Sequence, residues 1–205
     1  MTRSEIVIAT KNRGKVAEIR QIMEELGLLD AIDVLCLADF PDYPDVEETG
    51  DTFEENALIK ARAAASHTAV VAVAEDSGIE VEALGGAPGV RSGRFAGPDA
   101  TDAANNEKLL ARLSGLPDKR RGARFVAVIA LAGPDGRERT VRGECRGSVA
   151  DAPRGAGGFG YAPLFFYPHL GKTYAEMSNT EKNKISHRRR AIEELCRVLP
   201  EFLAG

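Results

Sequence analysis

Residues 70–97 read VVAVAEDSGIEVEALGGAPGVRSGRFAG, and the prediction of the fold starts from this stretch. Val70–Ala74 are small or β-branched, which is typical of a buried strand. The apolar run ends at two carboxylates, Glu75 and Asp76, and burying a charge is costly unless a counter-charge or a cation accompanies it. Two interpretations are open at this point. Asp76-Ser77-Gly78 is a turn that ends the strand, or the acids serve a ligand.

The composition limits the class of protein. The chain has 205 residues, enough to bury a sizeable core, and we expect a single domain over residues 1–205. Its formal net charge is −4, so nucleic acid is not an expected partner, because domains that bind it are usually basic. No apolar run reaches the ~18 residues of a membrane span, so no membrane association is expected. The 3 cysteines are far apart, which indicates reduced thiols in a cytoplasmic protein.

An apolar strand at Ile6–Ala9 is followed by the polar loop Thr10–Gly14 and by a helix that we expect to start at Lys15. A strand, a loop and a helix N-terminus in this order favour an anion-binding site. The Walker A pattern is absent, because Val16 and not Ser or Thr follows Lys15. A plain strand-to-helix turn with solvated cations is the alternative.

The next segment carries many acids. Ile32–Leu37 is a predicted strand, and Ala38–Asp51 is a predicted acidic loop. Thr52-Phe53-Glu54-Glu55 fits a capping box at the start of a helix, where acids favour the helix dipole. Glu47 and Glu48 precede the cap, so the dipole does not account for them.

The middle of the chain predicts a tight loop, a helix and a hairpin. The loop is Gly85–Gly89, and the helix spans Thr101–Leu113. The hairpin consists of Arg124–Ala132, the turn Gly133–Gly136 and a more polar second arm at Arg137–Arg146.

The segment Gly155–Pro163 is glycine-rich and contains Phe159 and Tyr161. Glycines let a backbone approach a ligand closely, and aromatic rings offer flat faces to a base. A flexible linker would also be rich in glycine, but it rarely contains aromatic residues. We therefore favour a binding loop.

A basic run, Met177–Arg190, precedes the last predicted helix, for which Ser186 is a natural N-cap. Cations at a helix start oppose the helix dipole, which suggests an anion or a carboxylate nearby. A solvated basic face and a nucleic-acid-binding patch are the alternatives.

Two charged sets emerge from this pattern. The carboxylates of the first set provide oxygen ligands for Mg²⁺ and are Glu47, Glu48, Glu75 and Asp76. The cations of the second set suit phosphates and are Lys11, Lys15, Lys60, Lys182 and Arg188. With a glycine-aromatic loop for a base, a nucleoside triphosphate is the natural ligand. Phosphoryl chemistry also needs a group that orients or deprotonates water, and Asp76 is the leading candidate.

These residues, in this order, resemble the Ham1/RdgB family of inosine/xanthosine triphosphate pyrophosphatases from Ile6 to Leu195. The matching pieces are Thr10-Lys11-Asn12-Arg13-Gly14-Lys15, Glu47 through Ala57, Glu75-Asp76-Ser77-Gly78, Ala83 through Gly89, Gly158-Phe159-Gly160-Tyr161, Glu181-Lys182 and Ser186-His187-Arg188. Each piece alone is a weak signal, whereas the ordered set is highly specific.

The resemblance implies hydrolysis of deaminated purine nucleoside triphosphates (dITP, ITP, XTP) to the monophosphate and pyrophosphate. It implies a Mg²⁺ cofactor, a homodimer, and an α/β fold with an elongated mixed β-sheet flanked by helices and two lobes around a central active-site cleft. Asp76 would be the proton acceptor and a metal ligand, with Glu47 as the second metal ligand. The implied substrate-binding residues are Thr10, Lys11, Asn12, Arg13, Gly14, Lys15, Lys60, Ser77, Phe159, Gly160, Tyr161, Lys182, His187 and Arg188.

The chain departs from the family pattern at Ala162, where an F-G-Y-D-P run usually has Asp. A missing carboxylate removes an acceptor from the nucleotide pocket. The alternative function is therefore a catalytically weakened nucleotide-binding protein of the same fold. Lys11 and Arg13 also stand where the family often has smaller or apolar residues.

Overall fold

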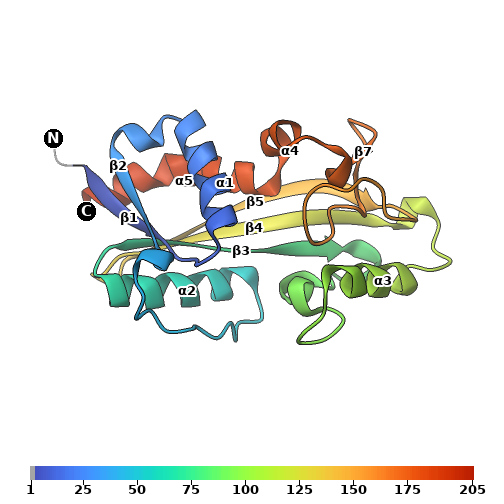
Figure 1. The fold of residues 1–205 in the computed structure, drawn as a ribbon, viewed down its shortest axis with the longest axis horizontal. Helices are drawn as coiled ribbons and strands as arrows, with labels where there is room; N and C mark the ends of the chain where they lie inside the picture. Colours follow the sequence, from blue (N-terminus) through green and yellow to red (C-terminus); the bar gives the residue numbers. More distant parts are fainter. Residues whose placement is uncertain (1–2) are drawn as a thin grey trace. The chain divides into compact units, whose positions relative to one another are not determined.

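A mixed seven-stranded sheet with helices forms the fold in the computed structural model, which describes residues 3–205 (Figure 1). The strand order is β2-β1-β3-β4-β5-β6-β7. The strands are β1 (Ser4–Ile8), β2 (Ile32–Cys36), β3 (Val71–Val81), β4 (Gly122–Ala132), β5 (Glu138–Val149), β6 (Phe165–Tyr167) and β7 (Lys172–Thr173). β1 pairs in parallel with β2 and β3, whereas β6 is antiparallel to β5 and β7. The predicted α/β class with a mixed sheet is confirmed.

The four predicted helices form with small shifts at their ends, as α1 (Arg13–Glu25), α2 (Phe53–Thr68), α3 (Asp102–Arg112) and α5 (His187–Ala204). A further short helix, α4 (Asn179–Ile185), lies within the basic run and was not predicted from the sequence. The capping box at Thr52 and Glu55 is present, as predicted. α1 begins before Lys15, because the Asn12 side chain accepts from the Lys15 N–H and caps the helix earlier. Among residues 3–205, no helix is both long enough and apolar enough to cross a membrane.

The chain divides into two compact units. The first unit comprises Met1–Asp76, Ala127–Gly143 and Arg188–Gly205, and the second unit comprises Ser77–Val126 and Glu144–His187. The unit boundaries fall within β3, β4 and β5, so each of these strands contributes residues to both units. The single domain and the cleft expected from the sequence stay predictions.

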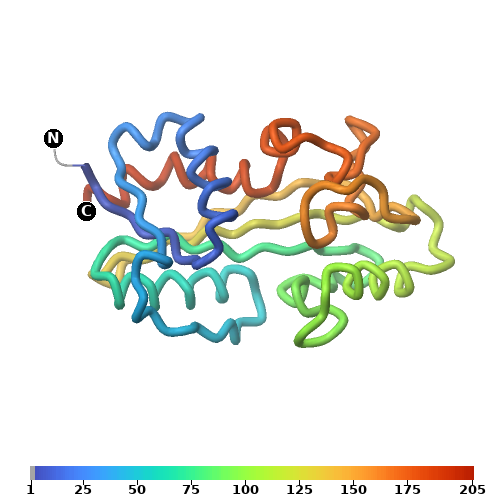
Figure 2. The backbone as a smooth tube through the Cα atoms, in the orientation of Figure 1, coloured from blue at the N-terminus to red at the C-terminus, as the bar shows by residue number. Residues whose placement is uncertain are grey.

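The core of the first unit lies between the sheet and two helices from opposite ends of the chain. Ile19 and Ile22 of α1 pack in one buried cluster with Ile192 and Leu195 of α5 and with strand residues such as Ile6. α2 covers the other face of the sheet in this unit (Figure 1). Figure 2 shows α1, near the start of the chain, and α5, at its end, on the same face.

The core of the second unit is rich in aromatic rings. Phe125 on β4 packs edge-on against Phe165, with ring centroids 4.7 Å apart, and stacks on Tyr174 at 5.5 Å. Leu109 and Leu113 bring α3 into the same buried cluster. Offset and edge-to-face ring pairs add to the stabilisation that the buried area already provides.

β3 differs from its prediction. The strand was expected to end at Ala74, but it continues through Glu75–Gly78 and ends at Val81. Alternation explains the continuation, because Ile79 and Val81 beyond the acids are fully buried in the core of the second unit. The interpretation of Asp76-Ser77-Gly78 as a strand-ending turn is therefore wrong.

Candidate phosphate and metal site

The predicted phosphate loop lies where ligands usually bind in parallel sheets. β1 pairs in parallel with β2 on one side and β3 on the other; α1 connects β1 to β2, and α2 connects β2 to β3. These two helices cover opposite faces of the sheet (Figure 1), and ligands of open α/β sheets usually bind at the carboxyl ends of the parallel strands. The loop that follows Ile8 lies at this end, and Ile8 pairs with Val73, two residues before Glu75.

Asp76 is held by a lysine from α2. Nζ of Lys60 lies 2.9 Å from Oδ1 of Asp76 and 3.0 Å from Oε1 of Glu48. The Asp76 side chain is 12% exposed. Burial raises the pKa of the Asp76 carboxyl, and the Lys60 ammonium opposes part of this shift. A buried carboxyl with a raised pKa is suited to accept a proton near neutral pH.

Glu75 points the opposite way, as adjacent residues of a strand do. Nε and an amino group of Arg188 donate to its two carboxylate oxygens at 2.6 and 2.8 Å. Nη1 of Arg188 also donates to Glu18 on α1 at 2.6 Å. Both Arg188 and Glu75 have side chains that are 4% exposed. The carboxylate predicted near the basic start of the last helix is therefore confirmed.

The Thr10–Lys15 segment forms the start of α1. The Asn12 N–H donates to Oγ1 of Thr10 at 3.1 Å, and the Asn12 side chain caps the helix. Lys15 points toward Glu75, with Nζ 4.0 Å from Oε1. Lys11 pairs with the exposed Asp45 at 3.0 Å.

A pocket of about 110 Å³ gathers several of these side chains. Its lining includes Thr10, Lys15, Glu48, Lys60 and Glu75, all from the first unit. Two ammonium groups beside a helix N-terminus make this pocket suitable for an anion such as a phosphate group.

The loop that carries the acidic pair is fixed from α2. The Gly50 N–H donates to the buried Asn56 side chain at 2.8 Å. A Cβ at Gly50 would lie 2.6 Å from Cβ of Glu55, so this close approach requires glycine. Of the two acids, Glu48 faces Lys60, whereas Glu47 is exposed.

The donor set suits a hard cation. Within residues 3–205, no three His, Cys, Asp or Glu side chains lie close enough to hold a metal by themselves. Mg²⁺ does not need such a cluster, because it is usually held by one or two carboxylates together with substrate phosphates and water. The Glu48 and Asp76 carboxylates already share one cationic group, the Lys60 ammonium, so oxygen ligands for a cation are present.

The predicted binding residues of the second unit have different exposures. The Phe159 side chain is exposed, with 60% of its surface accessible. Tyr161 is buried, and its hydroxyl donates to the Ser92 carbonyl at 2.8 Å. Ser77 is half-buried on β3. Gly160 lies between the two aromatic residues with φ of 61°.

His187 and Lys182 complete the predicted set in this unit. The His187 ring is buried and stacks on Phe125, with centroids 4.8 Å apart. Lys182 lies half-buried on α4. Ala162 is buried in the core of the same unit, and no observation favours the alternative of a weakened binding protein. Substrate binding by all of these residues stays a prediction.

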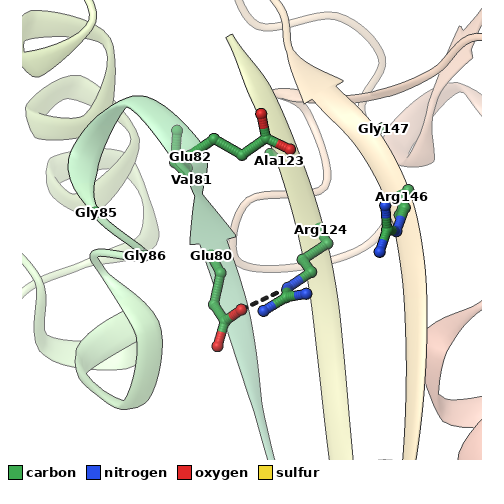
Figure 3. A pocket seen from close by; sticks show the side chains of 9 residues that line it. All are labelled: Glu80, Val81, Glu82, Gly85, Gly86, Ala123, Arg124, Arg146 and Gly147. Carbon is green, nitrogen blue, oxygen red and sulfur yellow. Dashed lines mark hydrogen bonds and ion pairs between the residues drawn. The ribbon is translucent and has the colours of Figure 1, made fainter.

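A separate pocket of about 400 Å³ lies in the second unit (Figure 3). Its charged lining residues are Glu80, Glu82, Arg124 and Arg146, and Nε of Arg124 lies 2.6 Å from Glu80. None of the predicted site residues belongs to this lining.

One charged residue beside the site, Glu18, was not predicted from the sequence. Glu18 supplies the second carboxylate to Arg188, from a position 170 residues away in the chain. Its place on the helix after the phosphate loop gives a weak signal, because an acid on the inward side of a predicted helix needs a counter-charge.

Comparisons with known proteins identify the family of this chain. A model of the Ham1 family matches residues 6–198. A protein of Syntrophobacter fumaroxidans named dITP/XTP pyrophosphatase is 52% identical and aligns over 97% of this chain and 83% of its own length. A Geobacillus kaustophilus protein of the same name is 49% identical and aligns over 98% of this chain and 97% of its own length. The solved structure of a HAM1 protein from Coxiella burnetii has a TM-score of 0.88 and 44% identity, over 97% of this chain and 99% of that one. The chain belongs to the Ham1 family.

Proposed function

We propose that this chain hydrolyses deaminated purine nucleoside triphosphates (dITP, ITP, XTP) to the nucleoside monophosphate and pyrophosphate. The relatives named dITP/XTP pyrophosphatase support this activity. The observation that carries the proposal is the buried Asp76 carboxyl, which Lys60 holds in the same unit as a phosphate-type loop and helix N-terminus.

Asp76 accepts the proton of the attacking water in this proposal. Water adds to the α-phosphorus, its proton passes to the Asp76 carboxylate, and the bond to the bridging oxygen breaks so that pyrophosphate leaves. Burial raises the pKa of Asp76, which makes its carboxylate a stronger base than an exposed aspartate. The hydrogen bond from Lys60 fixes one carboxylate oxygen and leaves the group oriented.

Basic groups of the first unit bind the phosphates. Lys15 and Lys60 offer ammonium groups to the pocket, and the first N–H groups of α1 add the positive end of the helix dipole. Glu48 and Asp76 would hold Mg²⁺, with Glu47 as the further candidate from the sequence. When bound, Mg²⁺ neutralises charge on the phosphate oxygens.

The remaining parts of the proposal rest on family resemblance. Phe159, Gly160, Tyr161, Lys182 and His187 take the base, and the chain works as a homodimer. A cytoplasmic location is also part of the proposal, and it is supported by the free cysteines, of which Cys36 and Cys145 are buried.

Product identification tests the proposal. The chain is incubated with dITP and MgCl₂, and the products are resolved by phosphorus NMR. We expect dIMP and pyrophosphate in equal amounts, with turnover lost on EDTA treatment and restored by Mg²⁺. Release of dIDP and orthophosphate would contradict the proposal, and so would the absence of turnover.

A further inference from the structure

Two side chains of helix α3 form hydrogen bonds with both backbone polar groups of Gly160, in the glycine-rich loop Gly155–Pro163. The Gly160 N–H donates to Oδ2 of Asp102 at 2.6 Å. Nδ2 of Asn106 donates to the Gly160 carbonyl at 2.9 Å. Asp102 and Asn106 are four residues apart, so they lie one turn apart on the same face of α3. All three residues belong to the second unit.

Gly160 lies in a tight turn. The Ala162 N–H donates to the Phe159 carbonyl at 3.2 Å, which closes the turn. Gly160 has a φ of 61°, in the left-handed region that favours glycine. Tyr161 is anchored by its hydroxyl to the Ser92 carbonyl. The turn is thus fixed on both sides of Gly160, and the exposed Phe159 ring projects from it.

α3 itself is a rigid support. The buried Asn105 side chain accepts from the Ala96 N–H at 2.7 Å and donates to the Gly93 carbonyl at 3.1 Å. Leu109, on the next turn, is fully buried in the core of the unit. A support of this kind fixes what is hydrogen-bonded to it, because core side chains are closely packed.

Ordinary structural roles explain why Asp102 and Asn106 are an acid and an amide, but they do not explain why both side chains bind the same residue. An acid in the first turn of a helix favours the helix dipole, which accounts for Asp102 alone. A buried amide needs a partner, which accounts for a hydrogen bond from Asn106. Neither explains why both side chains bind opposite backbone groups of a single glycine.

We propose that Asp102 and Asn106 are positioning residues that hold the Phe159 ring as a preformed face for the purine base. This inference rests on the proposed function, because it takes the substrate to be a purine nucleotide. A ring that is already ordered avoids the loss of conformational entropy that binding would otherwise cost. Stacking on an aromatic side chain contributes to the affinity for a base, so the orientation of the Phe159 ring affects substrate affinity.

The order of the loop can be measured without any substrate. The chain contains no tryptophan, so Phe159→Trp introduces a single fluorescent reporter on the loop. In this background, we expect Asp102→Ala and Asn106→Ala to raise acrylamide quenching about 2-fold and to lower anisotropy. Glu107→Ala removes an exposed charge from the same helix and should change neither reading. Unchanged quenching in both positioning variants would overturn the proposal.

Kinetics provide the second readout, with Phe159 intact. Each hydrogen bond to Gly160 contributes on the order of 1 kcal/mol, so Asp102→Ala should raise the KM for dITP about 5- to 10-fold. kcat should change less than about 2-fold, since contact with the base is the same in the ground and transition states. Asp102→Asn keeps an oxygen acceptor and should restore most of the affinity.

A matched variant separates positioning from loss of stability. Asn105→Ala removes another buried amide from α3 that does not touch Gly160. If it raises KM as much as Asn106→Ala does, the effect is structural and the proposal fails. If the unsubstituted chain releases no pyrophosphate from dITP, the proposed function fails instead, and the quenching result still tests the support of the loop.

Discussion

Nζ of Lys60 donates to Oδ1 of Asp76 at 2.9 Å, from α2 to β3. The same ammonium group bridges to Glu48, so one cation serves two carboxylates. Burial and Lys60 act on the Asp76 pKa in opposite directions, burial raising it and the ammonium lowering it. The balance between burial and the Lys60 charge sets the pH above which Asp76 is ionised and able to accept a proton, so the contribution of Lys60 can be measured.

Replacing the lysine should move the acidic limb of the pH profile. Lys60→Gln removes the opposing charge and leaves the burial, so the pKa of Asp76 rises. Because only ionised Asp76 accepts a proton, the acidic limb of kcat/KM for dITP should shift to higher pH. Arg62→Gln, an exposed cation on the same helix, is the control. If the acidic limb does not shift in Lys60→Gln, Lys60 does not control the pKa of the group that accepts the proton.

Asp76 itself can be tested with a nearly isosteric change. Asp76→Asn removes the proton acceptor, and we expect kcat for dITP to fall by about 10²- to 10⁴-fold. KM should change much less, because the phosphate-binding cations are intact. Pyrophosphate release at saturating Mg²⁺ measures both constants. Asp118→Asn, at an exposed position, serves as the control, and a kcat within 2-fold of wild type in Asp76→Asn would remove Asp76 as the base.

The Arg188 ion pair gives a prediction about stability. Arg188→Met leaves the Glu75 carboxylate buried without its bidentate partner, and breaking a buried pair in this way costs about 3–5 kcal/mol. Urea denaturation measures the free energy of unfolding. Arg197→Met removes an exposed cation from the same helix and should cost less than about 0.5 kcal/mol. Equal losses in the two variants would contradict the buried network.

Local signals made much of the fold predictable. The capping box at Thr52 depends on residues three apart in sequence, and the inward face of α5 depends on helical periodicity. Family resemblance added the order of the site segments. The continuation of β3 through its acids was not predictable locally, because Glu75 is neutralised by Arg188, 113 residues away. Long-range pairing of this kind leaves no periodic trace in the sequence.

The same limit applies to the loop at Gly160. Its glycines and aromatic residues marked a binding loop, but its support from Asp102 lies 58 residues earlier. Asp102 also fits an ordinary helix start, so its residue type gave no reason to look for a second role. The exposure of the two rings was not predictable either, because Phe159 and Tyr161 are both aromatic and yet only Phe159 is exposed.

Ala162 allows a test of the departure from the family pattern. The residue is 5% exposed and belongs to the core cluster of the second unit, so Ala162→Asp buries a carboxyl. We expect the free energy of unfolding to fall by about 1–3 kcal/mol and kcat for dITP to rise less than 2-fold. Ala156→Asp, at an exposed position in the same loop, is the control. A large gain in kcat with stability unchanged would show that the missing carboxylate matters.

Selectivity for the base is the most direct test of the proposed activity. kcat/KM is measured with Mg²⁺ for dITP, dGTP and dATP, and pyrophosphate is followed in each case. We expect kcat/KM for dITP to exceed the values for both ordinary purine nucleotides by about 10²-fold or more, because a pocket can reject a misplaced amino group strongly. Equal values for dGTP or dATP, or no pyrophosphate from dITP, would contradict it.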